Sequence, residues 1–210
     1  MHQLSHPGMY RAMTALLLLL PHTPLLFQGQ EFGVTTPFAF FADHKPDLAA
    51  QVREGRFEFL SQFPSLASEG MRARLPDPTD PEVFHSCQLD LTERERYREG
   101  YDLHRDLLKL RREDHAFQRP EEIDGAVLDT EIFVLRFFAD EDRLLLVNFG
   151  VDKRLTPVPE PLLASPQGTE WRILWSSEDP RYGGAGALPS ESAEGWGIPG
   201  RAAFVLQAGI

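Results

Sequence analysis

The sequence predicts an α+β composite, in which a helix-rich α/β layer precedes an all-β region. An apolar helix predicted over 7–20 is followed at once by a short apolar strand predicted over 24–28, and this order is typical of parallel α/β layers. A second strong helical pattern covers 93–112. From about residue 121, short runs rich in β-branched and aromatic residues alternate with acidic turns, which is the pattern of an antiparallel sheet.

The first helix is predicted from Pro7 to Leu20. Proline is tolerated in the first turn of a helix because its missing N–H has no partner there, and Pro21 ends the segment. The run of leucines that begins at Leu16 spreads apolar surface over every side of the helix, so burial on most sides is expected. We therefore expect neighbours that this chain does not encode to enclose the helix, and an exposed apolar surface around 16–27 in the chain alone. On this expectation the chain is a portion of a longer protein.

The residues from Pro24 to Gln28 form an apolar run between proline and glycine, which predicts a strand buried on both faces. A loop over 29–46, rich in phenylalanine and threonine, follows this strand. Another helix is predicted over 47–62, and an irregular connection rich in proline, serine and aspartate over 64–81.

The clearest helical pattern begins at Thr92. Thr92 and Glu95 have the spacing of a capping box. Apolar side chains then recur at helical intervals as far as Arg112; they are Tyr97, Tyr101, Leu103, Leu107, Leu108 and Leu110. The pattern predicts an amphipathic helix over 93–112 whose charged side faces solvent.

The carboxyl-terminal region is predicted to form an antiparallel β-sandwich. Its strand candidates are separated by acidic, proline-rich or glycine-rich connections and lie at 125–128, 131–138, 143–149, 170–175 and 202–207. We accordingly divide the chain into a first domain over 1–118 and a sandwich domain over 119–210.

The composition narrows the classes of function. A net charge of −11 and a pI near 5.1 disfavour binding to nucleic acids or anionic membranes, which requires clustered lysine and arginine. Cys87 is the sole cysteine, so we expect no intrachain disulfide, a small buried thiol and a reducing, cytoplasmic location. His2 and His6 have the spacing of helical metal ligands, but no third ligand accompanies them. We expect neither a metal site nor a cofactor.

Three segments carry most of the functional information. The first is TPLLFQGQEFG over 23–33, followed by PFAFFADH over 37–44. The second is YDLHRDL over 101–107, and the third is WSSEDPRYGG over 175–184. In this order they resemble the α-amylase superfamily of glycoside hydrolases, and within it the maltooligosyltrehalose trehalohydrolase family. The resemblance covers nearly the whole chain.

The resemblance implies a (β/α)8 barrel whose active site lies at the carboxyl ends of the strands. The helix, strand and helix over 1–118 would be the terminal part of this barrel, with the antiparallel β-sandwich behind it. Such enzymes retain anomeric configuration by using two carboxyl groups about 5 Å apart. In the family these groups come from earlier barrel strands, and none of their motifs occurs in this sequence.

The resemblance places neither Glu31 nor Asp43 at a catalytic position, so we expect no catalytic residue in this chain. As candidates for substrate binding we take the residues next to the implied sugar-binding face: Gln30, Glu31, Phe38, Asp43 and His44. A structural role is the alternative for most of them. Glu31 would anchor its loop, and Phe38 would be buried beneath that loop. Asp43 and His44 would hydrogen-bond within it.

The function that the resemblance implies is hydrolysis of the α-1,4-glucosidic bond next to the terminal trehalose unit of maltooligosyl trehalose, which releases trehalose. The chain would act on this or another α-glucan together with a missing amino-terminal barrel portion. A glucan-branching or debranching enzyme differs only in barrel residues outside this chain. The alternative from another class is a free-standing carbohydrate-binding or interaction module, with Trp171, Trp175 and Trp196 as its contacts. Because Trp171 and Trp175 are four residues apart on one predicted strand, they are expected to share a face, as a sugar platform or as the sandwich interior.

Overall fold

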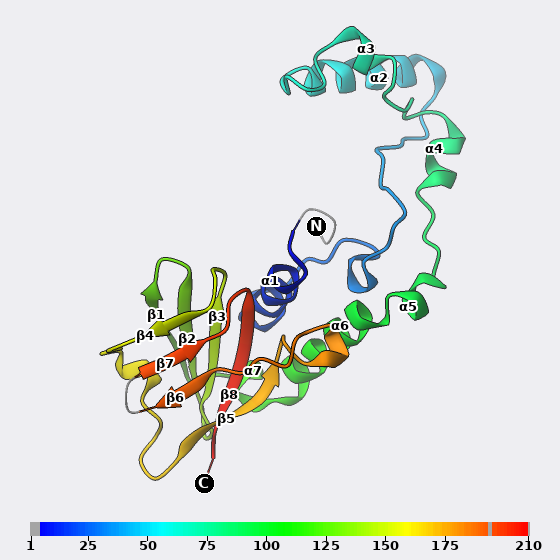
Figure 1. Cartoon of the computed structure of the whole chain (residues 1–210). Helices are drawn as coiled ribbons and strands as arrows, with labels where there is room; N and C mark the ends of the chain where they lie inside the picture. Colours follow the sequence, from blue (N-terminus) through cyan, green and yellow to red (C-terminus); the bar gives the residue numbers. More distant parts are fainter. Residues whose placement is uncertain (1–4, 193–194, 210) are drawn as a thin grey trace. The chain divides into compact units, whose positions relative to one another are not determined.

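The computed structural model of the chain describes residues 5–192 and 195–209, without the side chains of Glu69 and Arg72. The chain divides into two compact units (Figure 1). The larger unit consists of Met1–Gly33 and Arg94–Ile210, and the smaller unit of Val34–Glu93. None of the described helices is long and apolar enough to cross a lipid bilayer.

The larger unit contains the two long helices expected from the sequence. They are α1 (Pro7–Leu19) and α6 (Arg98–Glu113), accompanied by the short helices η1 (Gln30–Phe32), α7 (His115–Gln118), η2 (Pro161–Leu163) and η3 (Pro180–Tyr182). The short helix α5 (Glu93–Arg96) begins at the last residue of the smaller unit. The helix predicted over 93–112 is interrupted at Tyr97, whose backbone has φ −111° and ψ 44°. The helical pattern therefore forms α5 and α6 rather than one continuous helix.

Two antiparallel sheets form the carboxyl-terminal region, as predicted. The first has the order β1-β2-β3-β8-β5 and consists of β1 (Glu122–Asp129), β2 (Ile132–Phe138), β3 (Arg143–Asn148), β8 (Ala202–Gly209) and β5 (Glu170–Ser176). The second has the order β4-β7-β6 and consists of β4 (Lys153–Leu155), β7 (Gly195–Ile198) and β6 (Ser190–Ser192). All pairs of neighbouring strands are antiparallel.

The five-stranded sheet is the middle layer of the larger unit. Leu144 and Leu146 of β3 pack with the second sheet in one hydrophobic core. Leu145 and Val147, which alternate with them, pack with α1 and α6 in the other core. Because successive side chains of a strand point to opposite faces, β3 is buried on both sides. Figure 1 shows α1 and α6 against one face of this sheet and β4, β6 and β7 against the other.

The burial of α1 corrects one expectation from the sequence. Leu18 and Leu19 are 0% and 1% exposed, and α1 contacts β3, β8 and α6 of the same chain. Arg111 of α6 also donates hydrogen bonds to the carbonyl oxygens of Leu18 and Leu20, at 2.7 and 2.5 Å. One side of the helix is therefore buried by this chain, whereas Leu16, Leu17 and Leu20 are only half-buried. The expectation that neighbours encoded elsewhere enclose the helix on most sides is corrected for its inner face.

The segment over 24–28 also differs from its prediction. It forms no strand; Leu25 is 88% exposed and Phe27 is 54% exposed, while Leu26 packs against the helix-side core. A parallel strand finds all its backbone hydrogen-bond partners on neighbouring strands. The described part of the larger unit places no strand beside this segment, so the prediction of a strand buried on both faces is wrong for this structure. The expected apolar surface around 16–27 is present in part: Leu25, Phe27 and Met13 are exposed, and Leu16, Leu17 and Leu20 are half-buried.

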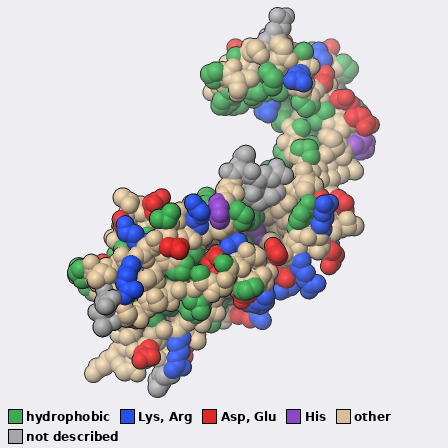
Figure 2. Space-filling model, in the orientation of Figure 1, with side chains coloured by type: hydrophobic (Ala, Val, Ile, Leu, Met, Phe, Trp, Pro, Cys, Tyr) green, Lys and Arg blue, Asp and Glu red, His purple; other side chains and the backbone are tan. Residues whose placement is uncertain are grey.

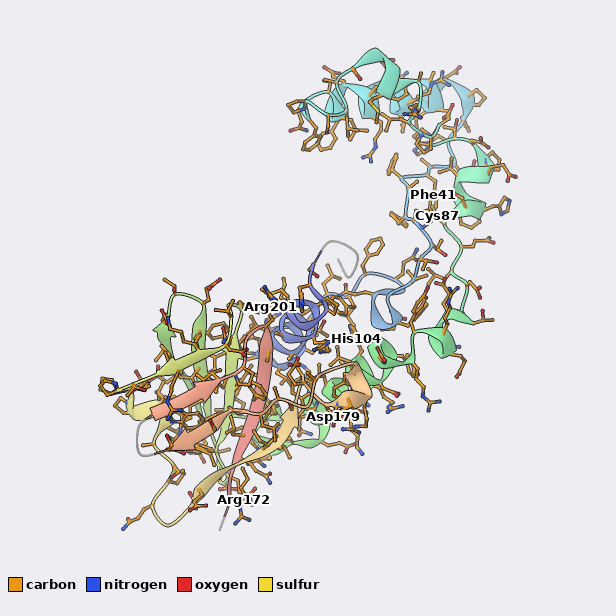
Figure 3. The ribbon with its side chains drawn as sticks, viewed as in Figure 1. Phe41, Cys87, His104, Arg172, Asp179 and Arg201 are labelled. Atoms are coloured by element: carbon orange, nitrogen blue, oxygen red, sulfur yellow. The ribbon has the colours of Figure 1, made fainter. Side chains whose placement is uncertain are left out.

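The smaller unit contains the predicted helix α2 (Pro46–Leu60) and the short helices α3 (Glu69–Arg72) and α4 (Pro81–Ser86). No residue of α2 is buried, and hydrophobic side chains make up much of the visible surface of this unit in Figure 2. Cys87 is buried as expected, and its Sγ accepts a hydrogen bond from the Ala39 N–H at 3.1 Å. Figure 3 shows Phe41 near Cys87. The Phe41 ring packs edge-on against that of Phe84.

A buried ion pair joins α1 to the segment after β5. Arg11 Nη2 lies 2.5 Å from Glu178 Oε1, and both side chains are about nine-tenths buried. Arg11 Nε also donates to the Ser177 carbonyl oxygen at 2.7 Å, and Glu178 Oε2 accepts from the Ala185 N–H at 3.2 Å. The charges of both side chains are thus compensated inside the larger unit.

We expect Glu178→Ala to destabilise the larger unit by about 3–5 kcal/mol, because it leaves the Arg11 charge buried without a partner. Urea unfolding followed by tryptophan fluorescence measures this, since all three tryptophans, Trp171, Trp175 and Trp196, lie in the larger unit. Arg98→Ala is the control, because it breaks an exposed ion pair and is expected to cost about 0.5 kcal/mol or less. Equal losses for the two variants would contradict the prediction.

Candidate functional site

The candidate substrate-binding residues fall into two groups. Gln30 and Glu31 lie on η1 of the larger unit, whereas Phe38, Asp43 and His44 belong to the smaller unit. The sequence places all five in one loop after a predicted strand, but the structure divides them between two compact bodies.

Gln30 and Glu31 lie in a tight turn bounded by two glycines, here called the Gly29–Gly33 loop. Gly29 has φ 78° and Gly33 has φ 63°, a left-handed conformation that glycine adopts without steric cost. Between them the chain makes one turn of 3-10 helix. The glycines in the motif QGQEFG are therefore required by the backbone of the turn.

Helices α1 and α6 hold this loop from two sides. The Tyr10 hydroxyl of α1 donates to the Gln30 carbonyl oxygen at 2.9 Å. Phe32 is buried in the core. Its backbone packs closely against α6 at Gly100, where an added Cβ atom would lie 3.8 Å from the Phe32 Cα. The Gln30 side chain turns back on its own segment and accepts from the Phe27 N–H at 3.3 Å. The half-buried Glu31 side chain is thus carried on a backbone fixed at both ends.

His104 of α6 is a buried histidine beside this loop (Figure 3). Its Nδ1 lies 2.8 Å from the Gly100 carbonyl oxygen, which can only accept, so Nδ1 carries the hydrogen. Its Nε2 is buried and has no hydrogen-bond partner among the described residues. Burial lowers the pKa of His104, and the Gly100 carbonyl and the Glu31 charge oppose this shift. The imidazole is therefore held in its neutral form.

Tyr10 of α1 lies close to His104 and to the loop. Its ring centroid lies 6.3 Å from that of His104. The pKa of Tyr10 is raised to about 12: burial is the largest cause, a hydrogen bond with the Thr14 side chain opposes the shift, and the Glu31 charge adds to it. The hydroxyl consequently stays protonated at neutral pH and remains a hydrogen-bond donor to the loop. The Gly29–Gly33 loop therefore carries one carboxyl group, that of Glu31, and the neutral side chains of Tyr10 and His104 lie beside it.

The candidates of the smaller unit are more open to solvent. Phe38 is 53% exposed, and its ring packs edge-on against Phe41 with centroids 5.9 Å apart. Within this unit the ring is therefore not buried beneath its loop. Asp43 and His44 are exposed.

The histidine pair considered as a metal site receives no support. His2 lies outside the described residues. His6 caps α1, since its Nδ1 accepts from the Gly8 N–H at 3.1 Å. Among the described residues, histidine, cysteine and acidic side chains form no group of three or more that could hold a metal ion.

The segments YDLHRDL and WSSEDPRYGG supply contacts between the helical layer and the five-stranded sheet. In YDLHRDL, Leu103 and Leu107 are core residues, and Asp106 accepts from the Tyr182 hydroxyl at 2.8 Å. In WSSEDPRYGG, Gly184 lies so close to Glu178 that a side-chain carbon would stand 2.2 Å from its carbonyl carbon. These residues connect α6 and α1 to the sheet, so both motifs have structural roles in this unit.

The tryptophans do not form a sugar-binding platform. A β-bulge between Ile173 and Trp175 shifts the alternation of β5 by one residue. Trp171 therefore packs beside the core between the sheets, while Trp175 belongs to the helix-side core. The prediction that the two share a face is wrong: Trp171 faces the sandwich interior, whereas Trp175 is buried in the core on the helix side. Trp196 is buried between the sheets as well.

Sequence reasoning missed two residues that position the Gly29–Gly33 loop. Tyr10 precedes Gln30, whose carbonyl oxygen it contacts, by 20 residues along the chain, and nothing in its local sequence indicates the contact. His104 lies in the segment YDLHRDL, but a single histidine on a helix carries no specific signal. Only their contacts across the larger unit identify them.

Comparison with known proteins identifies relatives of most of the chain. Residues 120–196 match a protein family described as a domain of unknown function (DUF3459). A malto-oligosyltrehalose trehalohydrolase of Deinococcus radiodurans is 36% identical over 190 residues, which are 85% of this chain and 31% of the relative. The protein of the same name from Rhizobium sp. (strain M-11) is 36% identical over 147 residues, 66% of this chain and 23% of the relative. The chain thus spans less than a third of the length of these relatives.

Solved structures share the fold. A protein assigned as an α-amylase from Salmonella typhimurium matches with a TM-score of 0.69 and 24% identity, over 99% of this chain and 32% of that one. A trehalose-6-phosphate hydrolase from Bacillus licheniformis matches with a TM-score of 0.59 and 16% identity, over 97% of this chain and 39% of that one. At these identities the likeness concerns the fold alone. The resemblance recognised in the sequence is confirmed by the two relatives named malto-oligosyltrehalose trehalohydrolase.

The pH dependence of stability should reveal the buried His104. Its pKa in the folded chain lies below the unfolded value of 6.5, so on acidification the unfolded chain binds the proton first. The stabilisation linked to this residue is complete above about pH 6.5 and is lost as the pH falls below that value. Asparagine at position 104 keeps a hydrogen-bond donor toward Gly100 but has no proton to bind in this pH range. When the pH is lowered from about 7 to about 5, we therefore expect the free energy of unfolding to fall less in His104→Asn than in the unchanged chain.

Urea unfolding at a series of pH values measures this difference. The exposed His22 provides the matched control His22→Asn. A parallel loss of stability in the unchanged chain and in His104→Asn would show that His104 is not held neutral by burial.

Proposed function

We propose, on the premise that the chain is related to the malto-oligosyltrehalose trehalohydrolases of the α-amylase superfamily, that it forms the carboxyl-terminal portion of such an enzyme. The complete enzyme would hydrolyse the α-1,4-glucosidic bond next to the terminal trehalose unit of maltooligosyl trehalose and release trehalose. The observation that carries this proposal is the sequence relationship to these enzymes over most of the chain. A cytoplasmic location is proposed with it, on the ground of the single, buried Cys87.

The bond-breaking step would belong to the rest of the enzyme. A retaining glycosidase needs two carboxyl groups about 5 Å apart across the sugar. The resemblance places neither Glu31 nor Asp43 at a catalytic position, and in the family the two groups come from earlier barrel strands. This chain would therefore contribute binding residues and no catalytic residue.

Residues 1–118 would be the terminal part of the barrel in this proposal. The segment over 24–28 is apolar on both sides, yet it has no neighbouring strand among the described residues of the larger unit. Strands of the remaining barrel would supply its backbone partners and would cover Leu25 and Phe27. The Gly29–Gly33 loop then follows the carboxyl end of a barrel strand, where barrel enzymes bind their substrates.

The candidate binding residues have distinct roles in this arrangement. Glu31 would accept hydrogen bonds from sugar hydroxyl groups, and the exposed ring of Phe38 would contact the C–H face of a glucose unit. Asp43 and His44, which are exposed in the smaller unit, would bind further hydroxyl groups. Gln30 would donate from its side-chain Nε2, because its Oε1 accepts from the Phe27 N–H and its backbone N–H and carbonyl oxygen are paired with Phe27 and Tyr10.

A free-standing carbohydrate-binding module is not favoured. That hypothesis requires Trp171, Trp175 and Trp196 to present their rings to a ligand. Trp175 and Trp196 are buried in opposite cores. Trp171 donates its indole N–H to the Leu163 carbonyl oxygen at 2.8 Å, and the Arg136 guanidinium lies over its ring. All three tryptophan side chains therefore make contacts within the larger unit.

A chimera tests the proposed function. We expect trehalose release from maltooligosyl trehalose when this chain replaces the matching part of the Deinococcus radiodurans relative. The relative without that part, and this chain alone, should release none, because each lacks part of the site. Trehalose is measured by chromatography, and thermal unfolding verifies that the chimera is folded. A folded chimera without activity would contradict the proposal, and turnover by the isolated chain would place catalytic groups within it.

A separate experiment tests the proposal that the segment over 24–28 pairs with strands of the remaining barrel. In the isolated chain, Leu25→Asp should change the free energy of unfolding by about 0.5 kcal/mol or less, because Leu25 is exposed. In the chimera the same change would bury a charge between strands and should cost about 3 kcal/mol or more. Val151→Asp, at another exposed position of the larger unit, should be tolerated in both proteins. A neutral effect of Leu25→Asp in both would refute the pairing.

A further inference from the structure

A buried carboxyl group ties the first and last segments of the smaller unit together. This unit runs from Val34 to Glu93, and Glu93 is 9% exposed. Glu93 Oε2 accepts from the Thr35 backbone N–H at 2.9 Å, and its Oε1 accepts from the Thr35 hydroxyl. Because hydrogen bonds to a carboxylate are about twice as strong as those between neutral groups, this double contact is a firm tie between the two ends of the unit.

More contacts join the same two segments farther from these ends. They are a hydrogen bond from the Ala39 N–H to Cys87 Sγ at 3.1 Å, an edge-on contact between the Phe41 and Phe84 rings, and a hydrogen bond from the Ala42 N–H to the Pro78 carbonyl oxygen at 2.8 Å. From 35 to 42 along one segment, the partners descend from 93 to 78 along the other. The two segments therefore run antiparallel, and the first is held at intervals along its length.

The candidate substrate-binding residues of the smaller unit lie on this held segment. Phe38 directly precedes Ala39, and Asp43 and His44 directly follow Ala42. Phe38 is 53% exposed, and Asp43 and His44 are exposed as well. The contacts between the segments thus use neighbouring residues and leave these three side chains open to a ligand.

The segment depends on such contacts to keep one conformation. Residues 34–45 form neither helix nor strand. Fixing the backbone of one residue costs about 1–2 kcal/mol of conformational entropy, and a segment that becomes ordered only on binding subtracts this cost from its affinity. Contacts that order the segment before the substrate arrives remove the cost from the binding step.

We propose that Glu93 is a positioning residue for substrate binding. Through Thr35 it holds the segment that carries Phe38, Asp43 and His44 in the conformation that binds the glucan. Glu93 itself does not contact the sugar in this proposal, and its effect is to lower the KM of the enzyme. The tie between the two segments follows from the contacts within the smaller unit, whereas its role in glucan binding rests on the proposed function.

The variant Thr35→Val, made in the chimera described above, tests this role. Valine lacks the hydroxyl that donates to Glu93, so we expect the KM for maltooligosyl trehalose to rise about fivefold or more at unchanged kcat. Thr35→Ser keeps the hydroxyl and should restore the original KM. A merely structural role would instead reduce the amount of folded enzyme, which lowers the apparent kcat and leaves KM unchanged.

Thr92→Val is the matched control. The exposed Thr92 also donates its hydroxyl to a carboxyl group, that of Asp90 at 2.6 Å, but both residues lie in the returning segment. The same substitution therefore removes the same kind of contact without loosening 35–44, and it should leave KM unchanged. Thermal unfolding verifies that each variant is folded.

A double-mutant cycle tests whether Thr35 and Glu93 act through the position of the Phe38 ring. Phe38→Ala alone should raise KM by about fivefold, because it removes an aromatic contact with the sugar. In the Thr35→Val background the same change should raise KM by only about twofold, because the ring has already lost its fixed position. An equal factor in both backgrounds would show that the two residues act independently.

Three results in an active chimera would overturn the inference. They are an unchanged KM in Thr35→Val, a lower kcat at unchanged KM in that variant, and an equal effect of Phe38→Ala in the two backgrounds. A folded chimera that releases no trehalose would refute the proposed function and, with it, the role of Glu93 in glucan binding. The activity of the unchanged chimera thus distinguishes the two failures.

Discussion

The larger unit depends on one constraint, which is that strand β3 is apolar on both faces. Leu144 and Leu146 point to one side, and Leu145 and Val147 to the other, and all four are fully buried. A strand of this kind is stable only between two covering layers, because exposing either face would leave a large apolar surface in water. The second sheet supplies one layer, and α1 with α6 supplies the other.

The helical layer links this core to the candidate site. Tyr10 of α1 and Gly100 of α6 fix the Gly29–Gly33 loop, and the same two helices bury the sheet through Leu18 and Leu107. The buried pair of Arg11 and Glu178 ties α1 to the segment after β5. The position of the Glu31 side chain is therefore set by packing around the sheet. In the proposed enzyme, this layer would serve as the rigid support of a substrate-binding loop.

The segments that support the resemblance to trehalohydrolases differ in their structural roles. The segments YDLHRDL and WSSEDPRYGG, which support the resemblance, supply contacts between the sheet and its helical layer. Positions of this kind accept few substitutions, because each side chain has partners in two layers. The segment TPLLFQGQEFG differs from them, since its glycines shape a turn while Leu25 and Phe27 are exposed. That exposure fits a segment whose partners, on the proposal, lie in the rest of the enzyme.

The sequence by itself determined the helices α1, α2 and α6, the strands after residue 121 and the family resemblance. These features follow from local periodicity, capping residues and turn residues, which act over a few positions along the chain. Tertiary structure decided the rest, because it depends on contacts between distant residues. The inner face of the apolar α1 is buried by α6, β3 and β8, which lie far from it along the chain. The segment over 24–28 carries a strand pattern, but a strand forms only beside another strand. A bulge in β5 placed Trp171 and Trp175 on opposite faces, and Tyr10 and His104 reached the Gly29–Gly33 loop through packing that no short segment encodes.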